Sequence, residues 1–207
     1  MKNPWEEIPL AAYEGHMQLG CVMQLQALNE MMKGQLDAYP VSSVMILGVA
    51  GGNGLEHVAK QKFKKVYGVD INTHYLQQTL HRYPELKGVL ECLHVDLLKE
   101  TGRLPPAELV IANLLIEYIG YACFQEAIRQ VKPRFVSCIL QMNAGDAWVS
   151  DSPYLHAFDG LEPIHHSIEK QALEKAMTEI GYHAVKALDY PLPNGKRLVQ
   201  ADFKRQP

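Results

Sequence analysis

One stretch near the start of the chain, residues 44–54, limits the possible folds more than any other. It opens with an unbroken apolar run from Val44 to Leu47, the pattern of a strand that is buried on both faces of a parallel sheet. Small residues follow as Gly48-Val49-Ala50-Gly51-Gly52-Asn53-Gly54, and apolar residues then return at helical spacing from Leu55 to Ala59. A strand, a glycine-rich turn and a helix in this order predict a corner where the backbone approaches a bound ligand, beside the unpaired N–H groups of the helix start.

Three further strand-like runs each end on a polar side chain. Residues 65–70 end on Asp70, residues 90–96 on Asp96, and residues 108–113 on Asn113. Ligands of open α/β sheets bind beyond the carboxyl ends of the strands, so we expect these side chains near the glycine turn. Asp70 also follows the turn at the distance where nucleotide-binding folds place a carboxylate for ribose hydroxyls.

This series of motifs resembles the class I S-adenosylmethionine-dependent methyltransferases, over residues 44–205. The resemblance implies that Asp70 binds the ribose, that Asp96 lies beside the adenine, and that Asn113 ends the strand facing the methyl group. The cofactor-binding residues that it implies are Gly48, Val49, Ala50, Gly52, Asp70, Ile71, Asp96, Leu97 and Asn113. The turn departs from the family pattern at Ala50, where glycine is commoner, and we expect alanine to be small enough for binding.

The remaining segments predict the fold class. Helices are expected over residues 73–82 and 121–131 and from a capping Ser167 to Ile180, with a strand over residues 134–141. Asn194-Gly195 between two strand-like runs predicts a hairpin. We therefore expect a doubly wound α/β fold, with a mostly parallel seven-stranded sheet, a C-terminal antiparallel hairpin strand and helices on both faces. Such a terminal hairpin is characteristic of the methyltransferase family, whereas NAD-type folds more often continue with parallel strands.

Residues 1–207 are expected to form one domain, in which a helical flap (residues 1–40) precedes the core (residues 41–207). Apolar residues recur at steps of three and four from Gly15 to Leu36, which predicts one or two amphipathic helices. Two aromatic residues and a histidine lie at or before the start of this region, namely Trp5, Tyr13 and His16. We expect this segment either to cover the cofactor or merely to anchor the N-terminus on the domain. Residues 142–166 are rich in aromatic residues and lack a clear period, so they form a lid loop or contain a short helix.

Methyl transfer from a sulfonium depends mainly on alignment and on the exclusion of water, so no nucleophile or triad is required. A general base is needed only if the acceptor arrives protonated. The candidates are His16, Glu117, His165 and His166, of which we prefer His16 and Glu117. Each has the alternative role of a pocket wall or a surface residue. Tyr13, His16 and Tyr118 are predicted to line the acceptor pocket.

The acceptor is expected to be a small molecule. Asn113-Leu114-Leu115-Ile116 lacks the Asn-Pro-Pro-aromatic pattern of enzymes that methylate planar amino groups in bases or glutamine. The formal net charge is −3, without a Lys/Arg stripe, which argues against nucleic-acid binding. Two alternatives stay open, an NAD(P)-binding oxidoreductase and a noncatalytic S-adenosylmethionine-binding protein.

The cysteines and the apolar runs indicate the cellular location of the protein. Cys21, Cys92, Cys123 and Cys138 form no close pairs, which predicts reduced thiols in a cytoplasmic protein without a metal site. The longest apolar stretch, residues 109–124, is interrupted by Asn113 and Glu117 and is too short for a membrane span. We expect a monomer or a homodimer that does not enter the membrane.

Overall fold

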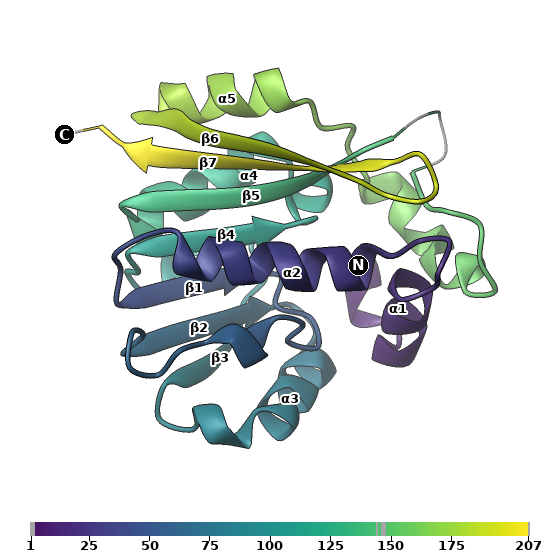
Figure 1. Cartoon of the computed structure of the whole chain (residues 1–207), viewed down its shortest axis with the longest axis horizontal. Helices are drawn as coiled ribbons and strands as arrows, with labels where there is room; N and C mark the ends of the chain where they lie inside the picture. The colour runs from purple at the N-terminus through teal and green to yellow at the C-terminus, as the bar shows by residue number, and fades with distance from the viewer. Residues whose placement is uncertain (1–2, 144, 146–147, 207) are drawn as a thin grey trace.

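The computed structural model describes residues 3–143, 145 and 148–206. Seven strands form one sheet in the order β3-β2-β1-β4-β5-β7-β6 (Figure 1). Their bounds are Ser43–Leu47 (β1), Lys65–Asp70 (β2), Leu90–His94 (β3), Leu109–Asn113 (β4), Phe135–Met142 (β5), Tyr182–Pro191 (β6) and Arg197–Arg205 (β7). Strands β1 to β5 are parallel, whereas β7 runs antiparallel to both β5 and β6. The predicted mostly parallel sheet with its C-terminal hairpin is confirmed.

Both faces of the central strands are buried, and the side chains of β1 alternate between two clusters. Val44 and Ile46 pack with residues of α2 (Gln24–Asp37) and α3 (Thr73–Arg82) on one face. Met45 and Leu47 pack on the other face with residues of α4 (Ile116–Val131) and α5 (Lys170–Glu179). Burying one such side chain fully stabilises a fold by roughly 1.5–3 kcal/mol, so this alternation fixes the layers. Helices cover both faces, as predicted.

The region before β1 contains two helices, α1 (Leu10–Met17) and α2, so the apolar period from Gly15 to Leu36 is divided between them. Residues 142–166 contain a 3₁₀ helix, Leu155–Ile164, which is the alternative left open for this region. Helix α1 and this 3₁₀ helix lie at the end of the sheet to which β1 and β4 point (Figure 1). They are therefore placed to cover a site at the carboxyl ends of the parallel strands.

The helix predicted directly after the glycine turn is wrong. A single 3₁₀ turn, Leu55–His57, stands in its place, and Val58 is already extended. Helix α2 occupies that face of the sheet, because Met32 and Leu36 pack in the same cluster as Leu55 and Val58. No full helix start therefore follows the turn.

Two other helix boundaries differ from the predictions. Ser167 does not cap α5, which begins at Lys170 after Glu169 without a side-chain cap. Helix α4 begins at Ile116 and is interrupted by Gly120, whose φ of 71° lies in the left-handed region. The predicted helix over residues 121–131 corresponds to the regular part after this interruption.

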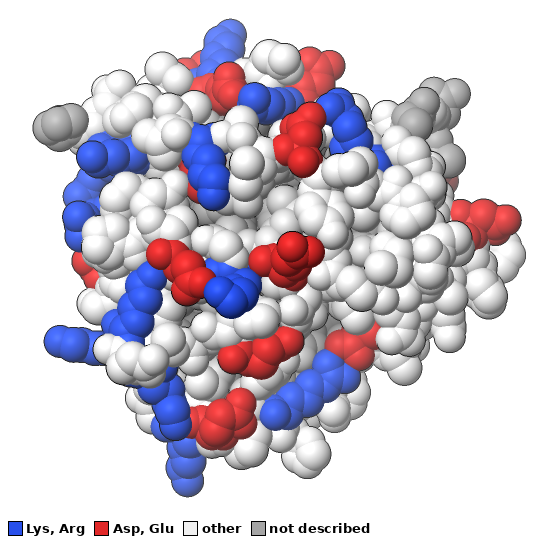
Figure 2. All heavy atoms as spheres, in the orientation of Figure 1, with Lys and Arg blue, Asp and Glu red and all other residues white. Residues whose placement is uncertain are grey.

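Charged side chains of both signs are intermixed on the face of the molecule in Figure 2. In the residues that the structure describes, no helix has the length and apolarity needed to cross a membrane.

Candidate functional site

The glycine-rich turn is tied to the end of the neighbouring strand β2. Gly48 has a φ of 71°, and a Cβ there would lie 3.2 Å from Cδ1 of Leu115, so the turn needs glycine at this position. Ala50 takes a left-handed φ of 48°, and its N–H donates to Oδ2 of Asp70 at 2.9 Å. The turn therefore holds the Asp70 carboxylate beside the carboxyl ends of β1 and β2.

Asp70 is held by backbone donors on both of its oxygens. Besides the bond from Ala50, the N–H of Asn72 donates to Oδ1 at 2.9 Å. Burial raises the pKa of the Asp70 carboxyl to about 6, although these N–H groups act in the opposite direction. A carboxylate accepts about four hydrogen bonds, so each oxygen keeps capacity for a further donor.

A cavity of about 90 Å³, which we name the strand-end cavity, adjoins this carboxylate. Of the predicted cofactor residues, seven line it: Gly48, Ala50, Asp70, Ile71, Asp96, Leu97 and Asn113. Val49 is not among them, and its N–H donates to the Val69 carbonyl at 3.0 Å. Gly52 also lies outside, where a Cβ would be 2.7 Å from Cε2 of Tyr83. Gly52 therefore serves packing in this structure.

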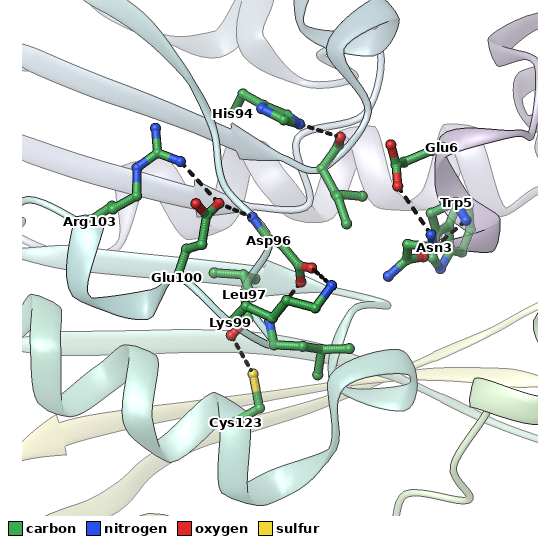
Figure 3. A network of polar contacts seen from close by, with 12 residues as sticks. Asn3, Trp5, Glu6, His94, Asp96, Leu97, Lys99, Glu100, Arg103 and Cys123 are labelled. Atoms are coloured by element: carbon green, nitrogen blue, oxygen red, sulfur yellow. Dashed lines mark hydrogen bonds and ion pairs between the residues drawn. The ribbon is translucent and has the colours of Figure 1, made fainter. Parts of the chain in front are cut away.

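Asp96 lies at the edge of the strand-end cavity within a charged network (Figure 3). Its Oδ2 pairs with Nζ of Lys99 at 2.7 Å, and its Oδ1 accepts the Leu98 N–H at 3.0 Å. Glu100 accepts from the Asp96 N–H at 3.2 Å and from Arg103 at 3.0 Å. The carboxylate thus shapes the loop after β3 as well as the cavity.

Asn113 lines the strand-end cavity, but its side-chain amide is hydrogen-bonded to Gln35 of α2. Its Nδ2 donates to Oε1 of Gln35, and Nε2 of Gln35 donates back to Oδ1 of Asn113, each at 2.9 Å. Gln35 is fully buried in α2 and also donates to Ser137. Asn113 therefore fixes the end of β4 against α2.

The N-terminal segment, residues 3–17, lies over the strand-end cavity. Trp5 and Tyr13 line the cavity, and the Trp5 carbonyl accepts from Nδ2 of Asn72 at 2.9 Å. Glu14 of α1 forms an ion pair with Arg82 of α3, whose Nη1 also donates to the Gly51 carbonyl at 3.1 Å. These contacts hold the segment closed across the glycine turn.

A second and larger cavity, of about 530 Å³, adjoins the first, and we name it the aromatic cavity. Five aromatic rings besides its histidines line it: Trp5, Tyr13, Tyr118, Trp148 and Phe158. Trp5, Tyr13, Leu114 and Tyr118 line both cavities. The two cavities are therefore neighbours that share one wall.

Glu117 lies in the first turn of α4 and lines the aromatic cavity. The residue is 5% exposed, and its Oε1 accepts the Gln141 N–H at 3.0 Å. Burial raises the pKa of this carboxyl to about 7, against the opposing effect of that bond. A carboxyl with this pKa can accept or release a proton near neutral pH.

The three histidines named from the sequence also reach the aromatic cavity. Nδ1 of His16 lies 2.8 Å from Oγ of Ser152, and burial, with the charge of Lys196, lowers the His16 pKa. The His165 ring stacks on Trp148 with centroids 4.3 Å apart, and burial likewise lowers its pKa. His16 lines the aromatic cavity but not the strand-end cavity.

Two glutamines of the aromatic cavity were missed in the sequence. Gln24 of α2 donates to Oε1 of Gln141, and Nε2 of Gln141 donates to the Trp148 carbonyl at 2.7 Å. Gln141 lies near the end of β5, so the rule that selected Asp70 and Asp96 would have found it. Gln24 opens a helix and carries no comparable signal.

Within residues 3–143, 145 and 148–206, no cluster of three or more His, Cys, Asp or Glu side chains has the arrangement of a metal site.

Solved methyltransferase structures share this fold. The chain is similar to geranyl diphosphate C-methyltransferase from Streptomyces coelicolor, with a TM-score of 0.65, 15% identity and coverage of 87% of this chain and 77% of that one. It is similar to magnesium protoporphyrin IX methyltransferase from Synechocystis, with a TM-score of 0.63, 12% identity and coverage of 94% and 87%. It is also similar to the cyclase SpnF, with a TM-score of 0.71, 8% identity and coverage of 98% and 95%.

At these identities the likeness establishes the fold alone, and the cyclase among the neighbours carries a name for another reaction. No protein-family model matches the sequence, and no curated protein compared with it is a match.

Proposed function

We propose that this protein transfers the methyl group of S-adenosylmethionine to a small-molecule acceptor. The observation that carries the proposal is the pair of adjoining cavities at the carboxyl ends of the strands. The strand-end cavity presents the carboxylates of Asp70 and Asp96, and the aromatic cavity offers about 530 Å³ for an acceptor. Ligand pockets for small molecules measure roughly 300–1,000 Å³, so the second cavity is large enough on its own.

The residues of the strand-end cavity suit a nucleoside. Asp70 keeps acceptor capacity on both oxygens, which ribose hydroxyls would use as donors. Ile71 and Leu97 are apolar and would pack against the adenine, beside Asp96. The cavity of about 90 Å³ is smaller than a nucleoside needs, so the N-terminal segment has to move outward as the cofactor binds.

S-adenosylmethionine, when bound, supplies a methyl group on a sulfonium that is itself a good leaving group. The protein's own contribution is alignment and the exclusion of water. Tyr13 and Tyr118, which line both cavities, would help to align the acceptor with the methyl group. The two catalytic candidates, Glu117 and His16, are both buried and both line the aromatic cavity, where Glu117 offers a carboxyl and His16 an imidazole next to Ser152.

The oxidoreductase alternative has weaker support. Asp70 suits a nicotinamide cofactor as well, but the antiparallel β7 inserted between β5 and β6 departs from the parallel continuation usual in those folds. A noncatalytic protein that binds the cofactor would have no need for a second cavity of this size beside the first. Both features favour methyl transfer.

A ligand comparison by calorimetry tests the proposal. S-adenosylmethionine and S-adenosylhomocysteine are expected to bind with micromolar or better dissociation constants, while NAD and NADP bind at least tenfold more weakly. Tighter binding of NAD or NADP would contradict the proposal. Binding of neither adenosyl compound would also contradict it.

A further inference from the structure

We propose that the acceptor is a protonated amine, which binds in the aromatic cavity against Glu117 and gives up its proton to that carboxylate. This inference rests on the proposed methyl transfer and specifies the substrate class of the same site.

The carboxyl of Glu117 has an oxygen that lacks a partner. Oε1 accepts the Gln141 N–H, whereas Oε2 is the single buried side-chain oxygen or nitrogen without a hydrogen-bond partner among the described residues. Leaving a buried polar atom unsatisfied costs about 1–3 kcal/mol, and more when the group is charged. Glu117 lines the cavity, and a cavity ligand that donated a hydrogen bond to Oε2 would remove this cost.

The charge of the cavity selects the kind of donor. No Lys or Arg belongs to the described residues that line it, while Glu117 and Glu169 do. The buried Lys196 donates its Nζ to the Trp148 carbonyl at 2.6 Å and does not line the cavity. A phosphate or carboxylate acceptor would therefore contact no Lys or Arg among the described lining residues, although the charge of Lys196 acts on His16 and His165, whereas an ammonium group would meet the Glu117 carboxylate.

The aromatic rings add a second attraction for a cation. Trp5 and Tyr118 meet at 84° with centroids 4.9 Å apart, and Tyr118 and Trp148 meet at 70° with centroids 6.3 Å apart. All three rings line the cavity. A cation over the face of an aromatic ring is stabilised by the electrons of that ring, most strongly where water is excluded.

Several titratable and charged groups surround Glu117 in the aromatic cavity. The described titratable groups that line the cavity with it, or whose pKa its charge raises, are Tyr13, His16, Tyr118, Tyr121, Cys138, His165, His166 and Glu169, and the charge of Lys196 acts on His16 and His165. Burial lowers the pKa of His16 and His165, so both rings are weaker bases than an ordinary histidine. Burial raises the pKa of Tyr118 and Cys138, so both keep their own protons.

The proton and electron balance is simple. The ammonium nitrogen gives one proton to the Glu117 carboxylate, which leaves a neutral amine with a free electron pair. That pair forms the new N–C bond to the methyl group, the S–C bond breaks with its electrons staying on sulfur, and the product carries the positive charge on nitrogen. The proton on Glu117 then leaves to solvent.

Matched probes test the inference without requiring turnover. We would measure binding of 2-phenylethylamine, 2-phenylethanol and phenylacetate, and of hexylamine, hexanol and hexanoate, to the protein saturated with S-adenosylhomocysteine. In both series the amine is expected to bind at least tenfold more tightly than the alcohol, and the carboxylate most weakly. An amine that binds no better than its alcohol, or no measurable binding by either amine, would overturn the inference.

Two variants locate the effect. Glu117→Gln keeps the shape of the side chain and is expected to abolish the preference for amine over alcohol, while the alcohol binds within twofold of wild type. Glu126→Gln removes an exposed carboxylate from the same helix and should leave the preference intact. A preference that survives Glu117→Gln would refute the role of Glu117. Failure of S-adenosylhomocysteine itself to bind would instead contradict the proposed function.

Discussion

At the scale of single residues, Asp70 is expected to contribute strongly to cofactor affinity. Hydrogen bonds to a charged group contribute roughly 1.5–3 kcal/mol each, so Asp70→Ala is expected to weaken S-adenosylhomocysteine binding by about tenfold to several hundredfold. The variant also loses the contacts to Ala50 and Asn72, so its folding must be checked by circular dichroism. Calorimetry gives the affinity, with Glu91→Gln, an exposed change on β3, as the control. Equal affinity in a folded variant would rule out this role.

Glu117 and Asp70 also make the stability depend on pH. Burial raises the pKa of Glu117 from 4.5 to about 7 and that of Asp70 from 3.8 to about 6. Between the ordinary and the raised value, the folded state binds more protons than the unfolded state, so the free energy of unfolding falls as the pH rises. For Glu117 the difference approaches about 3 kcal/mol above pH 7, at 1.36 kcal/mol per pKa unit.

Glu117→Gln is therefore expected to gain stability relative to wild type as the pH rises from 5 to 8, by about 2–3 kcal/mol. Urea unfolding at several pH values measures this difference, and the comparison between pH values cancels the fixed cost of the new amide. Glu126→Gln on the same helix is the control. A difference between Glu117→Gln and wild type that stays constant across this range would show that the carboxyl is not perturbed.

At the scale of elements, the ion pair between Glu14 and Arg82 joins α1 to α3 across the glycine turn. Both side chains are partly exposed, so the pair contributes at most about 1 kcal/mol to global stability. Arg82→Met is nevertheless expected to speed amide hydrogen exchange in α1 severalfold, because residues 10–17 lose a tether. Lys33→Met breaks an exposed pair within α2 and should leave exchange in α1 unchanged. Unchanged exchange in Arg82→Met would mean that other contacts hold the segment.

Strands were easier to predict than helices. The run predicted over Lys65 to Asp70 has the same bounds as β2. The burial of β1 on both faces was also predictable, because a strand that is buried on both sides has an unbroken run of apolar residues. The prediction of a helix after the glycine turn was wrong because it depended on the helical spacing from Leu55 to Ala59, which is a local pattern. It does not reveal that α2, from before β1, already fills that face of the sheet.

The candidate site was predictable for residues at the carboxyl ends of strands, where ligands of open α/β sheets bind. Asp70 and Asp96 were found because strand ends meet at one edge. The partners of Asn113 and Glu117 were not, since Gln35 and Gln141 lie 78 and 24 positions away. Such pairings depend on how the layers stack, which a local pattern does not contain.

At the scale of the whole molecule, Trp5 belongs to both cavities. Trp5→Ala is expected to weaken binding of S-adenosylhomocysteine and of the amine probes together, each by about tenfold, because one truncated ring opens both. Calorimetry with each ligand alone and with both present measures this. Because Trp5 lines both cavities, each ligand is expected to favour binding of the other, and this coupling is expected to shrink in the variant. Loss of only one affinity would show that Trp5 serves a single cavity.

The wall that the two cavities share also predicts the order in which the two substrates bind. The strand-end cavity is covered by residues 3–17, and the same residues complete the aromatic cavity, so an acceptor bound first would hold the cover shut. Steady-state kinetics should therefore follow a compulsory order in which S-adenosylmethionine arrives first and S-adenosylhomocysteine departs last. S-adenosylhomocysteine would then inhibit competitively against S-adenosylmethionine and noncompetitively against the acceptor, and the opening of fifteen residues would limit turnover.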